Sequence, residues 1–251
     1  MGRRARFAGH AFTALALTVW AVYGLSVESY VMPGPVSVAV RLGEFFSDIY
    51  MVQHVFITIG HILGAVAVSV VIGSACALLA FYLPVTGLMI HSRLTPFLNS
   101  FSGIGWTLLA IVWFGINDIT VVFAISMVLV PFAIINMREG LDALDGELLE
   151  MGRSFTRSGW RRFRRIIVPA LYPFIFATLR ISFGVAWKVA LTAELFGGNA
   201  GLGYLLNLAR QDFDMPLILG VILIIIAFVY ATDQFVFAPI QARLARHHGV
   251  G

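Results

Sequence analysis

Six long apolar runs, separated by short polar segments, dominate the pattern of this chain. They cover residues 8–27, 55–82, 99–115, 119–137, 168–193 and 216–238. A transmembrane helix needs about 20 mostly apolar residues to cross the hydrocarbon core of a bilayer. The pattern therefore predicts an all-α, polytopic membrane protein with about six transmembrane helices in a single domain, residues 1–251. The run at 99–115 is short and rich in glycine and serine, so a re-entrant segment with five spans is the alternative.

Composition and charge support this class and exclude others. The chain is 59% hydrophobic and 12% charged, whereas soluble domains average about 45–50% apolar and 25% charged residues. Arginines lie beside the apolar runs, where they set topology, so nucleic-acid binding is a poor explanation. Cys76 is the only cysteine, which excludes an internal disulfide and indicates a buried, inert thiol. The histidines lack metal-ligand spacing with carboxylates or the cysteine, so we expect no metal.

The basic segments alternate with acidic ones along the chain. Arginine gathers before the first run, between the second and third, between the fourth and fifth, and after the last. The positive-inside rule then places both termini in the cytoplasm and makes the first run a retained helix rather than a signal peptide. On the opposite side, residues 30–50 begin with a Pro-Gly-Pro turn and predict an amphipathic helix at the outer surface. That helix either packs at the interface or helps to dock an external partner.

The most polar segment, about residues 139–167, predicts two short cytoplasmic helices. The first has an apolar stripe at Leu148, Met151 and Phe155, with Gly152 on the same face. The second, which Ser158 can cap, carries arginines on both sides of an apolar face and leads into the next span. The arginines favour an anchor on anionic lipid, whereas the mixed charge and the glycine of the first helix favour a groove in another protein.

This segment resembles the EAA signature of permease subunits of ATP-binding-cassette importers, E-A-A-x-x-x-G followed after nine residues by I-x-L-P. The aligned positions are Glu150, Met151 and Gly152, then Thr156 at the signature's glycine, and finally Ile166, Val168 and Pro169. Thr156 is the largest departure. The stretch "AELFGGNAGLGYLL" at 193–206 is similar to the nitrate/sulfonate/taurine-type branch, and the resemblance extends over about residues 33–246.

The resemblance implies a type I importer permease fold in the bacterial inner membrane. Two copies would form the pathway, a pair of cytoplasmic ATPases would drive it, and a periplasmic binding protein would deliver the solute. The chain has no GxxxxGK[ST] loop, so ATP and magnesium would bind the partner and this chain would not be an enzyme. The residues expected to couple it to the ATPase are Glu150, Met151, Gly152, Phe155, Thr156, Ile166 and Pro169.

Three ionisable residues of the fifth run and its end, Arg180, Lys188 and Glu194, are candidates for the translocation pathway. On one continuous helix they fall within an arc of about 120°. Two cations on one face suit a small anion such as a sulfonate or nitrate. Alternatively, Arg180 pairs with Asp233, Lys188 reaches the interface, and Glu194 braces the glycine-rich segment that follows.

Other solutes and other classes stay open at this point. His61 is expected to be a hydrogen-bonded interior residue rather than a ligand. Pyrimidine and thiamine precursors or riboflavin fit the same branch. A membrane-embedded enzyme would need a converging set of catalytic side chains, which the sequence does not provide. A secondary transporter would need no ATPase-docking helix.

Overall fold

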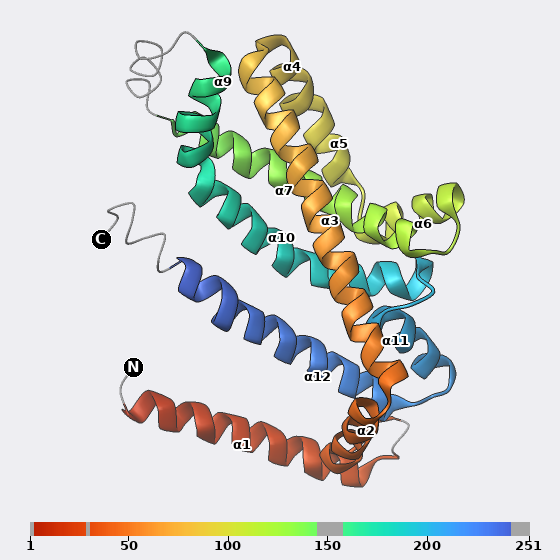
Figure 1. Cartoon of the computed structure of the whole chain (residues 1–251). Coiled ribbons are helices and arrows are strands. Elements are labelled where there is room, and N and C mark those ends of the chain that lie inside the picture. The colour runs from red at the N-terminus through yellow and green to blue at the C-terminus, as the bar shows by residue number, and fades with distance from the viewer. Residues whose placement is uncertain (1–2, 29–30, 145–157, 242–251) are drawn as a thin grey trace.

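The computed structural model describes residues 3–28, 31–144 and 158–241, and these residues form helices joined by short connections (Figure 1). Four stretches are long and apolar enough to cross a membrane: Ile49–Tyr82, Asp118–Asp142, Gly159–Gly197 and Met215–Gln241. The number rises to five when one bent pair of helices counts as a span. The helix α1 (Arg3–Ser26) adds a shorter apolar segment, Phe12–Ser26. The prediction of an all-α polytopic protein is confirmed.

The core is built on three helices, α3 (Ile49–Tyr82), α7 (Asp118–Asp142) and α10 (Val168–Gly197). The helix α7 lies against both others and carries the largest set of fully buried apolar side chains, among them Ile125, Leu129 and Ile134. The helices α3 and α7 approach closely at Gly73, where an added Cβ would lie 2.4 Å from the Cβ of Ala133. Small residues at such a crossing allow the backbone contact that stabilises helix pairs in membranes.

The run at 99–115 does not form one straight span, which corrects that part of the prediction. The segment α4 (Pro84–Met89), η1 (Ile90–Leu94) and α5 (Thr95–Ser100) is followed by α6 (Gly103–Phe114) after a bend of 87°. Phe101 is extended, and the side chain of Ser102 accepts a hydrogen bond from the Gly105 N–H, so a new helix begins there. This geometry fits the alternative of a broken or re-entrant segment.

Within the segment 30–50, for which the sequence predicts an amphipathic helix, the structure has α2 (Pro35–Ser47), which packs across α12 (Met215–Thr232). It buries Val38 and Phe45. Arg41 pairs with Asp214 and with Glu44, at 2.7 Å in each case. Desolvation alone would lower the pKa of Arg41, but the hydrogen bonds to both carboxylates outweigh it and raise this pKa above its ordinary value.

The remaining elements complete the chain around this core. A short helix α9 (Gly159–Arg162) and η2 (Phe163–Ile167) lead directly into α10, and η3 (Asp233–Phe237) extends α12. The helix α11 (Leu202–Gln211) follows α10 after a tight turn. In Figure 1, α1 runs apart from the α3–α7–α10 core over much of its length and meets the rest of the chain near α2. The helix α12 packs on α10 through side chains, with Trp187 and Phe228 at 5.2 Å between ring centres.

Candidate functional site

The connection from α10 to α11, residues 198–203, is the most constrained turn of the described chain, and we call it the glycine turn. Gly201 has φ +105°, and an added Cβ there would lie 2.3 Å from Cδ of Glu194. At Gly203 an added Cβ would lie 2.4 Å from the carbonyl oxygen of Leu191. Only glycine allows the backbone to approach Glu194 and α10 this closely.

Glu194 anchors the glycine turn from inside the protein. Its side chain is completely buried, and its Oε2 accepts hydrogen bonds from the Thr58 hydroxyl (2.9 Å) and the Gly203 N–H (2.8 Å). Its Oε1 lies 2.8 Å from Nδ1 of His61. A buried carboxylate is tolerated only with such partners, so Glu194 serves here as the brace of the turn that the sequence offered as one alternative.

Three polar side chains on one face of α3 contact the glycine turn or its anchor Glu194. His54, Thr58 and His61 are spaced by four and three residues, which aligns them along one side of a helix. The Gly201 N–H donates to Nδ1 of His54 at 2.9 Å, and the Leu202 N–H donates to the Thr58 hydroxyl at 2.7 Å. The N–H groups of Gly201, Leu202 and Gly203 thus each have a side-chain acceptor.

The first residues of α7 join the same network. Nε2 of His61 lies 3.3 Å from Oδ1 of Asp118, the first residue of α7. The Asn117 N–H donates to the Gly197 carbonyl at 3.1 Å. His61 therefore bridges α3, α7 and α10, which confirms that it is a hydrogen-bonded interior histidine.

Arg180 makes the alternative contact that the sequence allowed, an ion pair with Asp233. Its Nη2 lies 2.9 Å from Oδ1 of Asp233, and its Nε also donates to that carboxylate. A further nitrogen donates to the side-chain oxygen of Gln241. The guanidinium is therefore neutralised and joins α10 to the last helix.

Lys188 differs from both neighbours on α10. The helix is continuous from residue 180 to 194, as the arc prediction requires, but Lys188 is exposed whereas Glu194 is buried. The structure therefore separates the three charges into an ion pair, an exposed cation and a buried brace. Of the three, Lys188 is the one whose charge stays accessible from the surface.

The coupling residues lie only partly within the described structure. Glu150, Met151, Gly152, Phe155 and Thr156 lie outside the described residues. Ser158 caps α9 by accepting from the Arg161 N–H, as the sequence predicts, and Ile166 and Pro169 flank the junction of η2 with α10.

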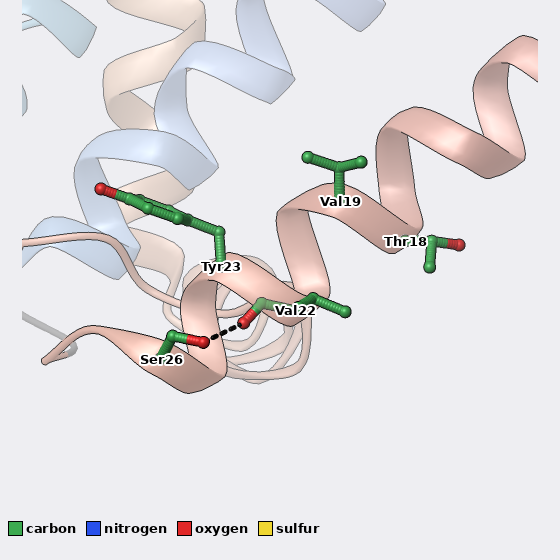
Figure 2. Close-up of a pocket in the computed structure, with 5 residues that line it drawn as sticks. All are labelled: Thr18, Val19, Val22, Tyr23 and Ser26. Carbon is green, nitrogen blue, oxygen red and sulfur yellow. Dashed lines mark hydrogen bonds between the residues drawn. The ribbon is translucent and has the colours of Figure 1, made fainter.

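A second region, a mostly apolar pocket on α1, offers no comparable chemistry. Figure 2 shows an open pocket lined by Thr18, Val19, Val22, Tyr23 and Ser26. The hydroxyls of Thr18 and Ser26 donate to carbonyls of their own helix, at 2.8 Å and 2.9 Å. These two hydroxyl protons are thus already used within α1.

Comparison with known proteins decides the family. The chain matches the binding-protein-dependent transport system inner membrane component family over residues 69–246. The chain belongs to this family. It is a permease of the ATP-binding-cassette importer class, as its resemblance implies.

Two relatives and one solved structure place this permease more closely. An aliphatic sulfonates transport permease protein of Bacillus subtilis is 29% identical, with 89% of this chain and 81% of the relative aligned. The riboflavin transport system permease protein of Chloroflexus aurantiacus is 28% identical, with 92% and 87% aligned. The fold matches that of the inward-facing MetNI methionine transporter with a TM-score of 0.67 and 16% identity, covering 77% of this chain and 95% of that one. The permease therefore has the type I importer fold.

Sequence reasoning missed the partners of Glu194. It did not connect His54, Thr58 or Asp118 with the glycine-rich segment. The available signal was the spacing of His54, Thr58 and His61 within an otherwise apolar run. A single polar stripe on a membrane helix indicates a face turned toward protein rather than lipid.

Proposed function

We propose that two copies of this permease form the pathway of an ATP-driven importer in the bacterial inner membrane. The family match over residues 69–246 carries this proposal. The fold adds support, because a single chain leaves many large apolar side chains exposed that a lipid bilayer or a second copy would cover. A separate ATPase supplies the energy, and a periplasmic binding protein delivers the solute.

Coupling to the ATPase runs through the segment at 139–167. The sequence around Glu150 supports this assignment, since an acidic residue and a nearby glycine match the signature positions that the resemblance implies. The described part of the segment, α9 with η2, continues without a break into α10. A continuous helical connection of this kind transmits a displacement of the segment to α10, the helix that carries Arg180, Lys188 and Glu194.

The test uses the permease co-expressed with its ATPase. Glu150→Lys and Gly152→Asp are each expected to abolish co-purification of the ATPase or its coupled ATP hydrolysis. Asp212→Lys makes the same charge reversal at an exposed position that ends α11, outside the coupling segment, and should leave both intact. Unchanged association and hydrolysis in both signature variants would overturn the coupling assignment.

The solute proposed is a small anion such as a sulfonate or nitrate. The similarity to a sulfonates permease supports this class, and so does Lys188, an exposed cation on α10. The pairing of Arg180 with Asp233 leaves only one of the two predicted cations with an accessible charge. A riboflavin-type solute is the second candidate, because a relative of somewhat higher coverage carries that name.

Uptake into proteoliposomes that hold permease, ATPase and binding protein separates the two solutes. ATP-dependent accumulation of a labelled sulfonate but not riboflavin is expected. Lys188→Ala should reduce sulfonate uptake about 5–150-fold by removing a charged contact worth about 1–3 kcal/mol, and Lys188→Arg should retain most of it. Wild-type anion uptake by Lys188→Ala would overturn the role of this cation, and exclusive riboflavin uptake would overturn the anion.

A further inference from the structure

The two histidines of α3 hold the glycine turn through opposite arrangements of protons. We propose that His54 and His61 are positioning residues that fix the glycine turn only within a window of pH. At low pH the hydrogen bond between His54 and the turn is lost. At high pH the contact of His61 with the buried carboxylate of Glu194 is weakened.

His54 binds the turn only when one ring nitrogen carries no proton. The Gly201 N–H donates to its Nδ1 at 2.9 Å, and an imidazole nitrogen accepts a hydrogen bond only in its unprotonated form. A proton on Nδ1 would set two N–H groups against each other. The titratable groups that face this ring are Tyr50 on α3, edge-on at 4.8 Å, and Tyr204 on α11, stacked at 5.8 Å between ring centres.

His61 has the opposite requirement. Its Nδ1 lies 2.8 Å from Oε1 of Glu194 on α10, and its Nε2 lies 3.3 Å from Oδ1 of Asp118 on α7. Ionised carboxylate oxygens only accept hydrogen bonds, so each of these two contacts needs a proton between the nitrogen and the oxygen. A neutral imidazole between two carboxylates supplies one proton, whereas the bridge needs two.

The position of the second proton does not alter this count. It lies on the line between Nδ1 of His61 and Oε1 of Glu194, whichever of the two atoms it is bonded to. It does not come from the other oxygen of Glu194, which already accepts from the Thr58 hydroxyl and the Gly203 N–H. Removal of one proton from the coupled pair therefore breaks one of the two hydrogen bonds of His61.

Both changes act on the same short backbone. Acid frees the Gly201 N–H, and alkali loosens Glu194, which holds Gly203. The Leu202 N–H stays bound to Thr58, which does not titrate. The turn is thus loosened at either extreme and tethered at its centre throughout.

Two substitutions each remove the response at one end of the pH range while they preserve the contacts of the turn. His54→Asn places an amide oxygen near the position of Nδ1, an acceptor that acid does not protonate. Asp118→Asn offers an N–H to Nε2, so a neutral His61 with its proton on Nδ1 completes both bonds. The Asp118 side chain is 63% exposed, so the exchange leaves the buried packing unchanged.

The experiment follows a nitroxide on Asn199→Cys, at an exposed position of the turn, with Cys76→Ser removing the native thiol. The full-length permease is held in lipid nanodiscs and scanned from about pH 5 to pH 10, a range that extends to both sides of the ordinary histidine pKa. The ratio of mobile to immobile label should rise about fivefold at each end, the factor for losing one ordinary hydrogen bond. His54→Asn should remove only the acid rise, and Asp118→Asn only the alkaline rise. A label on Ser92→Cys in η1 should give a flat profile.

A flat profile for wild type, or both rises retained in both variants, would overturn the proposal. Nitrogen NMR of histidine-labelled wild type gives a second measurement that needs no variant of these residues. It should show Nδ1 of His54 unprotonated near neutral pH and both nitrogens of His61 engaged with protons. A protonated Nδ1 on His54, or a single proton on the His61 bridge, would overturn it too. Neither readout depends on transport or on an ATPase.

Discussion

At the scale of single residues, the glycine turn tolerates almost no added volume. Gly203→Ala would place a methyl group 2.4 Å from the Leu191 carbonyl oxygen and 2.7 Å from Cβ of Glu194. Backbone has to move to accept it, so we expect a loss of about 1–3 kcal/mol in unfolding free energy. The matched control is Gly184→Ala in α10, where an added Cβ meets no atom within 4 Å. It should be neutral or stabilising by about 0.5–1 kcal/mol. Thermal unfolding in detergent, followed by exposure of the Cys76 thiol, measures both.

A second residue-scale prediction concerns the hydroxyl of Thr58. It donates to Glu194 and accepts from the Leu202 N–H, so Thr58→Val leaves the buried Leu202 N–H without this acceptor and removes one of the two donors to Oε2 of Glu194. An unsatisfied buried group costs about 1–3 kcal/mol. Thr178→Val removes a hydroxyl that is equally buried but donates to the Phe174 carbonyl one turn away in the same helix. The same unfolding measurement should show a much smaller loss there, and equal losses would contradict the role given to Thr58.

At the scale of elements, the ion pair between Arg180 and Asp233 is the feature that ties α10 to the end of the last helix. A double-mutant cycle with Arg180→Ala and Asp233→Ala should give a coupling energy of about 0.5–3 kcal/mol, because each single variant strands the other charge. The pair Arg138 and Asp142 lies within α7 and is exposed, so its cycle should give only about 0.3–0.5 kcal/mol. Denaturant unfolding of the purified permease measures both cycles. Equal coupling energies would mean that Arg180 does not join the helices.

The same scale shows what the sequence could predict and what it could not. Hydrophobic run length predicted α3, α7, α10 and α12, since each crossing needs a minimum length of apolar residues. Ser158 was predicted to cap the short helix that leads into the fifth run, and it caps α9 there. The sequence offered a re-entrant segment at 99–115 as the alternative, but it did not place the 87° bend after Ser100, because apolar content does not encode helix direction. The contacts of Glu194 with Thr58 and His61 join residues more than 130 positions apart, and such pairings follow from packing and not from local pattern.

At the scale of the whole molecule, the proposed pairing of two copies predicts how a defective copy acts on a normal one. Wild-type permease and Glu150→Lys permease, co-expressed in equal amounts and carrying different tags, should assemble at random into pairs. If both copies must engage the ATPase, only the fully wild-type pairs work, and coupled ATP hydrolysis should fall to about one quarter of the wild-type value, as a two-fold symmetric assembly requires. Purification through both tags isolates the mixed pair, which should be inactive although its ATPase content is reduced only in part. A fall to about one half would mean that each copy works alone, and it would contradict the shared pathway. Asp212→Lys in place of Glu150→Lys should leave hydrolysis at the wild-type value, because that exposed charge lies at the end of α11, outside the coupling segment.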